Sequence, residues 1–187
     1  MYVKPKIPTL DEEEIERVVN PNWLIDLIEM KIIIPSRKLL REAIGRPDIN
    51  MINEKIYVGS YPTLSRSAKK FLAFPESTLL IDLRSSSEAA RRTLELETQS
   101  IPLKDGSFIS DADLAKLVQK IQIDSPEKII LLCRQGRNRS VNLAIALLMK
   151  LYSYSLKSAI CELSSKRKFI RITREQMSKL LELELGK

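Results

Sequence analysis

The sequence contains no histidine, and its only cysteines are Cys133 and Cys161. The absence of histidine excludes a Ser-His-Asp triad, a Cys-His protease dyad and a His-ligated metal site. Two cysteines cannot build a structural zinc site alone, and they do not form a disulfide framework. We therefore predict that the protein uses no metal and no cofactor, and we expect a reducing compartment.

The sequence also lacks long hydrophobic runs. The longest, residues 32–34 and 143–149, fall far short of the roughly 20 residues that cross a bilayer. Residues 1–10 show no charged-then-apolar signal pattern. We expect a cytoplasmic protein with no membrane partner. The richness in Leu, Ile, Lys, Glu and Arg leans toward a thermophilic source.

Positive charge is in excess. The 187 residues include 31 Lys and Arg against 24 Asp and Glu, which gives a formal net charge of +7. Such a charge suits an anionic partner, such as a phosphorylated substrate, nucleic acid or an acidic surface. The alternative is a soluble protein that is basic without functional reason.

The chain divides into an extension and a main domain. Residues 1–50 are predicted to form a helical N-terminal extension packed on the main domain, with helices over 11–16, 22–32 and 37–44. Residues 51–187 alternate strands with helices. Strands are predicted over 55–59, 78–83, 100–103 and 128–132, and helices over 64–74, 87–96, 110–121, 139–152, from 156 onward and over 173–185. This alternation predicts an α/β fold with a central, mainly parallel twisted sheet of four to five strands flanked by helices.

One loop carries the chemistry. The buried strand over 128–132 runs into Cys133, and a buried helix begins near Arg139 and Ser140. A strand, a short loop and a helix N-terminus together form an anion site, because the loop N–H groups and the helix dipole present positive charge. The predicted phosphate-binding residues are Arg134, Gln135, Gly136, Arg137, Asn138 and Arg139.

Cys133 is the predicted nucleophile. The same positive field favours its thiolate, which can attack phosphorus and form a phosphocysteine that water then hydrolyses. Arg139 offers a planar fork that matches two phosphate oxygens, and Ser140 can hydrogen-bond the departing sulfur. The alternative for Cys133 is a buried structural cysteine at a strand end. Cys161 is predicted to be a core thiol, with a redox pairing to Cys133 as the lesser alternative.

The segment from Cys133 to Ser140 resembles the Cys-x5-Arg-Ser/Thr loop of the protein tyrosine phosphatase superfamily, and is most similar to its small dual-specificity branch. Further segments resemble that branch: residues 56–60, residues 81–84 with Glu88, and residues 155–160 followed by Arg167 and the final helix. The resemblance covers about residues 51–185. It implies a cysteine-dependent phosphatase acting on phosphotyrosine, and on phosphoserine or phosphothreonine, in proteins.

The resemblance also implies a general acid on a loop after a strand. Asp105, followed by Gly106, is the predicted residue, with Asp111 and Asp113 as competitors. Asp111 also suits a helix start. Asp82 lies in a buried strand and is predicted to orient the backbone or Arg84.

Two departures from the family pattern keep other functions open. Leu132 stands where the family usually has histidine, which leaves open slower catalysis, a need for higher pH, or a non-catalytic phosphate-binding module. Because Cys133, Arg139 and Ser140 are all present, we favour a working enzyme. Asn138 before Arg139 resembles the loop of RNA 5′-triphosphatases, and Arg134 and Arg137 add cations for densely anionic substrates. A further group of cations, at 166–168, 171 and 174, is predicted to be a solvated helix end, with an RNA-binding patch as the alternative.

Overall fold

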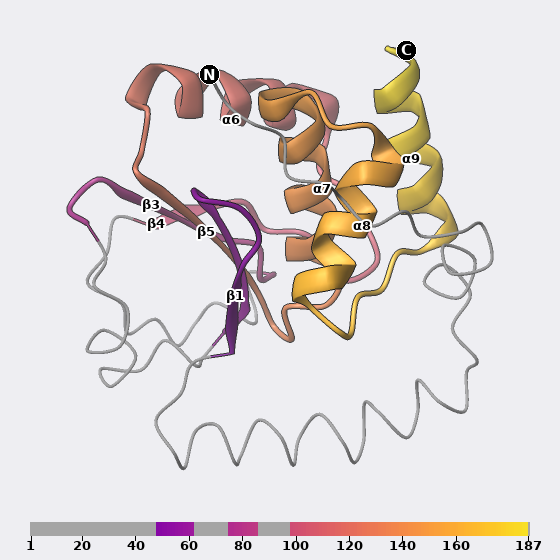
Figure 1. Cartoon of the computed structure of the whole chain (residues 1–187), viewed down its shortest axis with the longest axis horizontal. Helices are drawn as coiled ribbons and strands as arrows, with labels where there is room; N and C mark the ends of the chain where they lie inside the picture. Colours follow the sequence, from indigo (N-terminus) through magenta and orange to yellow (C-terminus); the bar gives the residue numbers. More distant parts are fainter. Residues whose placement is uncertain (1–47, 62–74, 86–97, 187) are drawn as a thin grey trace.

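The computed structural model describes residues 48–61, 75–85 and 98–186. Within these ranges, five strands form one sheet in the order β1-β2-β5-β3-β4. The strands are β1 (Ile49–Met51), β2 (Ile56–Ser60), β3 (Thr78–Asp82), β4 (Thr98–Ser100) and β5 (Lys128–Cys133). All neighbouring pairs are parallel except β1 with β2. The α/β class and the mainly parallel sheet are confirmed (Figure 1).

Four helices follow in the described part of the chain. They are α6 (Asp111–Asp124), α7 (Arg139–Tyr152), α8 (Leu156–Lys166) and α9 (Arg174–Leu185). The N-cap side chains of Ser110, Ser155 and Thr173 each accept a backbone N–H from the first turn of their helix, which satisfies donors that have no partner within the helix. The helices predicted over 64–74 and 87–96, and those within residues 1–47, lie outside the described residues.

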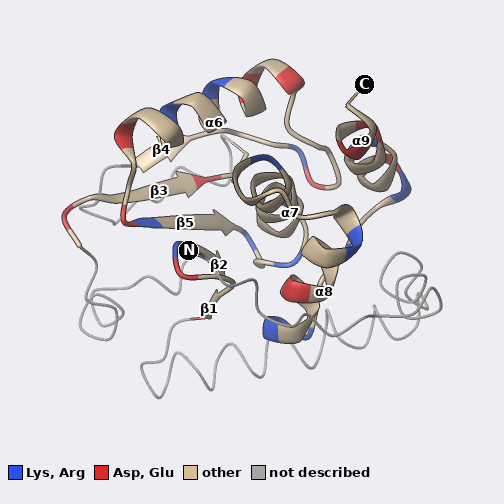
Figure 2. Ribbon diagram, turned by 45° about the horizontal axis from the view of Figure 1, so that its top comes forward, with Lys and Arg blue, Asp and Glu red and all other residues tan. Residues whose placement is uncertain are grey.

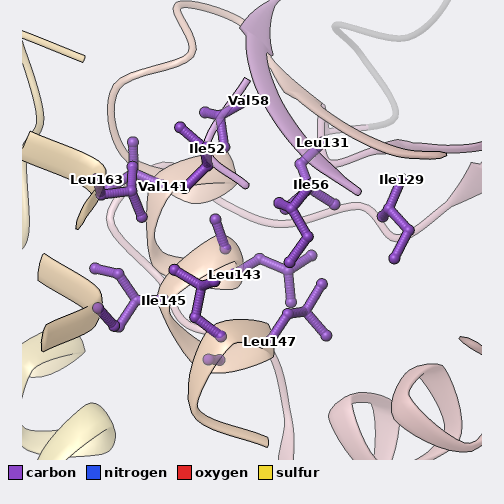
Figure 3. Close-up of a cluster of buried hydrophobic side chains, with 14 of the residues drawn as sticks. Ile52, Ile56, Val58, Ile129, Leu131, Val141, Leu143, Ile145, Leu147 and Leu163 are labelled. Carbon is purple, nitrogen blue, oxygen red and sulfur yellow. The ribbon is translucent and has the colours of Figure 1, made fainter. Parts of the chain in front are cut away.

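Helix α7 forms the centre of the core. All its residues from Arg139 to Leu148 are buried, and α6, α8 and α9 pack around it on the same face of the sheet. Figure 2 shows charged residues along α6, α8 and α9, whereas α7 is almost free of them. Figure 3 shows Leu143 and Leu147 on the side of α7 that faces strand residues such as Ile56, whereas Ile145 lies on the opposite side, toward the neighbouring helices. This burial fixes the first turn of α7 against the sheet. The predicted phosphate-binding loop, which begins at Cys133, runs into that turn.

The opposite face of the sheet is buried as well. Leu80, Ile130, Leu132 and Tyr61 form a second cluster that contains no residue of α6–α9. Because successive strand residues point to opposite faces, β5 contributes Ile129, Leu131 and Cys133 to the helical face. A strand buried on both faces reads as the continuous apolar run seen at 128–132.

Two elements differ from the prediction. β1 was not predicted, because three residues at a sheet edge carry too short a pattern. β4 occupies Thr98–Ser100 and not 100–103. Two hydrogen bonds to the segment of β3 continue beyond this strand, because Ile101 N donates to Asp82 O at 3.0 Å and Leu103 N donates to Leu83 O at 3.4 Å. Pro102 lies between these two donors, on the edge side of the sheet, so its missing N–H removes no bond to β3.

The carboxyl ends of three parallel strands meet at one edge of the sheet. Ser60 of β2 pairs with Cys133 of β5, and Asp82 of β3 pairs with Leu132. Ligand sites of open parallel sheets lie outside such ends. In the described residues, no helix is both long and apolar enough to cross a membrane.

Candidate active site

The sulfur of Cys133 is the base of the site. Cys133 is 2% exposed, and its Sγ accepts the N–H of Gly136 at 3.1 Å. The hydroxyl oxygen of Ser140 lies 3.2 Å from the same sulfur. The two contacts fix the position of the sulfur at the base of the loop.

Gly136 allows the loop to turn directly above β2. Its φ of +67° lies in the left-handed region, and an added Cβ would stand 2.7 Å from the carbonyl oxygen of Gly59 and would overlap Arg167. A side chain would therefore meet both backbone strain and a backbone clash. This tight contact brings the Gly136 N–H to the sulfur.

Arg167 holds the outer side of the same loop. It is 6% exposed, and its guanidinium donates to Gly136 O at 2.5 Å and to Gln135 O at 3.4 Å. Its Nη2 also pairs with Asp48 Oδ2 at 3.0 Å. The C=O and N–H of one peptide unit point in opposite directions. Because Arg167 binds the carbonyls of Gln135 and Gly136 on the outside of the loop, the N–H groups of the same peptide units point to its inside. The predicted solvated helix end is therefore wrong for Arg167, which is buried because it replaces water at these carbonyls.

The guanidinium of Arg139 is anchored at two backbone carbonyls. Its Nη1 donates to Leu83 O at 3.2 Å and to Leu103 O at 3.1 Å. The segment after β3 is itself held, because Asp82 Oδ1 accepts Arg84 N at 3.0 Å and Asp82 Oδ2 pairs with Arg84 Nη2 at 2.9 Å. This confirms the structural role predicted for Asp82. The anchoring fixes the plane of the Arg139 fork.

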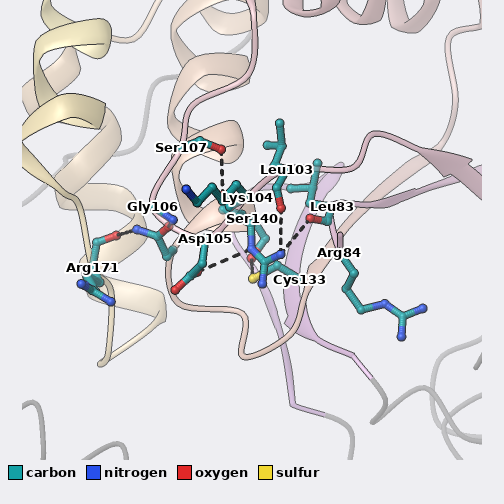
Figure 4. Close-up of polar contacts among 12 residues, drawn as sticks. Leu83, Arg84, Leu103, Lys104, Asp105, Gly106, Ser107, Cys133, Ser140 and Arg171 are labelled. Carbon is teal, nitrogen blue, oxygen red and sulfur yellow. Dashed lines mark hydrogen bonds and ion pairs between the residues drawn. The ribbon is translucent and has the colours of Figure 1, made fainter. Parts of the chain in front are cut away.

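Asp105 reaches the site from the loop after β4. Its Oδ1 lies 3.7 Å from Nε of Arg139, and its side chain is 67% exposed. Figure 4 shows Asp105 near Cys133 and Ser140, with Leu83 and Leu103 on the other side of the arginine contact. Of the competitors, Asp111 opens α6 and Asp113 pairs with the Ser110 cap at 2.6 Å. Asp105 alone of the three carboxylates lines the pocket.

These residues enclose a cavity of about 140 Å³. That is the volume of about four or five water molecules, which suits a phosphoryl group. Four arginines and one aspartate line it, so its surroundings carry a net positive charge. The lining residues are Asp105, Cys133, Arg134, Gln135, Arg137, Asn138, Arg139 and Arg171.

Most of the predicted phosphate-binding residues therefore meet at one cavity. Gly136 and Ser140 do not line the cavity and instead contact the sulfur of Cys133. Arg171 was predicted as part of a solvated patch but lies at the cavity, where the Arg171 N–H donates to Arg137 O at 2.8 Å. The side-chain amide of Asn138 donates to Oε1 of Gln176 at 2.7 Å. Gln176 was not predicted as a residue of the site. The Thr173-x-x-Gln176 capping box was the available sequence signal.

Leu132 lies away from this chemistry. It is 0% exposed within the second cluster, on the opposite face from Cys133. Its side chain packs against the Gly59 backbone of β2. The residue fills space on the far face of the sheet, whereas the sulfur of Cys133 accepts the N–H of Gly136 and contacts the hydroxyl of Ser140 on the helical face.

Comparison with known proteins identifies the family of this chain. Residues 56–185 match the family described as dual specificity phosphatase, catalytic domain. No curated protein sequence matches at a significant level. Among solved structures, Tk-PTP in its active form is 23% identical with a TM-score of 0.64, over 75% of this chain and 99% of that chain. PTPMT1 in complex with PI(5)P is 19% identical with a TM-score of 0.63, over 74% and 96%.

Human DUSP28 is similar to the same degree, at 20% identity and a TM-score of 0.62 over 75% of this chain and 95% of that chain. At such identities the structural likeness shows the fold. The family match is independent of it and spans more than half of the sequence, including β2, β3, β5 and every described helix. The chain therefore belongs to the dual specificity phosphatase catalytic-domain family.

Proposed function

We propose that the protein hydrolyses phosphotyrosine in proteins, with phosphoserine and phosphothreonine as further substrates, through a phosphocysteine at Cys133. One observation carries this proposal. The Cys133 sulfur, held by Gly136 N–H and Ser140, lies in the same cavity as the Arg139 fork and the Asp105 carboxyl. That set supplies a nucleophile, an oxyanion site and a proton donor.

In the first step, the Cys133 thiolate attacks phosphorus and the bond from phosphorus to the leaving oxygen breaks. The inward loop amides and the guanidinium of Arg139 stabilise the charge on the three equatorial oxygens. Asp105, as the carboxylic acid, gives its proton to the leaving oxygen, which departs as an alcohol or phenol. The sulfur is left bonded to the phosphoryl group.

In the second step, water attacks the phosphocysteine. The Asp105 carboxylate takes a proton from that water, and the S–P bond breaks to release inorganic phosphate. The electron pair of that bond returns to sulfur as thiolate. The hydroxyl of Ser140, at 3.2 Å, can donate to the departing sulfur and lower the barrier to this step.

Hydrolysis of an aryl phosphate and of phosphopeptides tests the proposal. The wild type should release phosphate and be inhibited by vanadate, which mimics the five-coordinate phosphoryl group. Cys133→Ser should lose turnover on every substrate, because an alkoxide is not available at neutral pH. Turnover that survives Cys133→Ser would contradict the mechanism.

The same assay distinguishes the two alternatives. Release of phosphate from triphosphorylated RNA in preference to phosphopeptide would favour an RNA 5′-phosphatase. Tight phosphopeptide binding with no turnover would favour a non-catalytic module. Asp105 at the cavity supports the enzyme, because a binding module has no use for a proton donor beside the phosphoryl site.

A further inference from the structure

Gln176 is a fully buried amide outside the phosphate loop. It lies in the first turn of α9 and is 0% exposed. Its Oε1 accepts the N–H of Thr173 at 2.9 Å and the amide of Asn138 at 2.7 Å. Its Nε2 donates to Ser107 O at 2.9 Å and to Asn138 Oδ1 at 3.0 Å. An amide buried this deeply is costly unless it is bonded on both sides, as this one is.

These bonds join the proposed acid loop to the phosphate loop. Asn138 precedes Arg139, and its Oδ1 accepts the N–H of Gly106 at 3.2 Å. The hydroxyl of Thr173 donates to Gly106 O at 3.3 Å. Both sides of Gly106 and the carbonyl of Ser107 are therefore tied to Asn138 and to the start of α9.

The position of Asp105 depends on these hydrogen bonds to Gly106 and Ser107. Its side chain is 67% exposed, and its ion pair with Arg139 is long, at 3.7 Å. The next residue, Gly106, has a φ of +83°, and because glycine has no Cβ its backbone can adopt other conformations unless hydrogen bonds hold it. The fixed backbone at Gly106 and Ser107 therefore sets where the Asp105 carboxyl points.

The cap of α9 does not explain why residue 176 is an amide. A glutamate at this position would also accept the Thr173 N–H in a capping box. Its carboxylate would then face the Ser107 carbonyl and Asn138 Oδ1, which both accept, at the 2.9 Å and 3.0 Å that Nε2 now occupies. Donation toward the acid loop is the property that only glutamine supplies.

We propose that Gln176, acting through Asn138 and Gly106, is a positioning residue for the proton donor Asp105. This inference rests on the proposed phosphatase function. Gln176 does not contact the sulfur and meets the cavity lining only through Asn138, so its loss should displace the acid more than the nucleophile. The expected defect is specific: it grows as the leaving group becomes a weaker acid and needs the proton more.

The test compares kcat/KM, which reports the first chemical step, for 4-nitrophenyl phosphate and phenyl phosphate. Gln176→Glu and Asp105→Asn should each lose about 100-fold on phenyl phosphate and less than about tenfold on 4-nitrophenyl phosphate. The double variant should lose little more than Asp105→Asn. Glu175→Gln, an exposed neighbour in the same turn, is the matched control and should behave as wild type.

Equal losses on both substrates would reduce Gln176 to a structural residue and overturn the proposal, as would wild-type behaviour of Gln176→Glu. If Gln176→Glu does not fold, Gln176→Met keeps the volume, removes the amide and carries the same comparison. Amide hydrogen exchange at Gly106 gives a readout without catalysis and should accelerate in either variant. An inactive wild type would end the proposed function, while unchanged exchange at Gly106 would overturn the role of Gln176 by itself.

Discussion

At the scale of single residues, Cys133 is defined by what surrounds its sulfur. The Gly136 N–H at 3.1 Å and the Ser140 hydroxyl at 3.2 Å lie against a side chain that is 2% exposed. A buried polar group is stable only when such contacts replace its water. The family's usual histidine is absent at Leu132, and the described polar contacts of the sulfur come from the loop and from α7. Leu132 is thus a packing residue of the far cluster.

Leu132→His is predicted to cost stability and to leave catalysis nearly unchanged. It places an imidazole in the cluster of Leu80 and Ile130, both 0% exposed, so we expect a loss of about 2 kcal/mol in the free energy of unfolding. Urea unfolding measures it, and Leu132→Met, which conserves volume, should lose less than about 1.5 kcal/mol. A tenfold gain in kcat/KM with no loss of stability would show that this position tunes the nucleophile.

At the scale of elements, the unit of β5, loop and α7 could be predicted from the sequence, because its signals are local. An apolar run, Gly136 at the turn and an apolar helix face lie next to one another in the chain. Asp105 followed from its place after a strand and from the family resemblance. The contacts by which Arg167 holds the phosphate-binding loop could not be predicted. Arg167 contacts Asp48 across 119 positions and Gly136 across 31, and no periodicity reports a side chain bonding a distant carbonyl.

Arg167→Met is predicted to loosen the loop and weaken the fold. It removes the donors to Gln135 O and Gly136 O and leaves Asp48 without its partner, so we expect a loss of about 3 kcal/mol. We also expect at least about tenfold lower kcat/KM, because small displacements of catalytic groups are costly. Lys168→Met, at an exposed neighbour, should change stability by less than about 0.5 kcal/mol. Equal effects of the two substitutions would contradict the role given to Arg167.

At the scale of the whole molecule, charge and topology act together. The sheet order β1-β2-β5-β3-β4 places Cys133 between the ends of β2 and β3. Four arginines line its cavity, and the chain carries a formal net charge of +7. The field of such a molecule should draw phosphorylated, acidic substrates to the cavity.

Salt is therefore predicted to weaken substrate capture. As the salt concentration rises from about 0.05 M to about 0.5 M, the screening length shortens severalfold. We expect kcat/KM for an acidic phosphotyrosine peptide to fall through KM, and to fall more than for a peptide with neutral flanks. Steady-state kinetics at several salt concentrations measures both. Equal salt dependence of the two peptides would show that charge outside the phosphoryl site has no part in binding.

The most direct test follows the phosphoryl group in Ser140→Ala. This change removes the hydroxyl beside the sulfur, so departure of sulfur in the second step should slow while the first step proceeds. Rapid mixing with an aryl phosphate should give a burst of phenol equal to the enzyme concentration. Mass spectrometry of the quenched protein should place one phosphoryl group on Cys133. A burst with the phosphoryl group on another residue, or steady turnover with Cys133 unmodified at all times, would contradict a phosphocysteine intermediate.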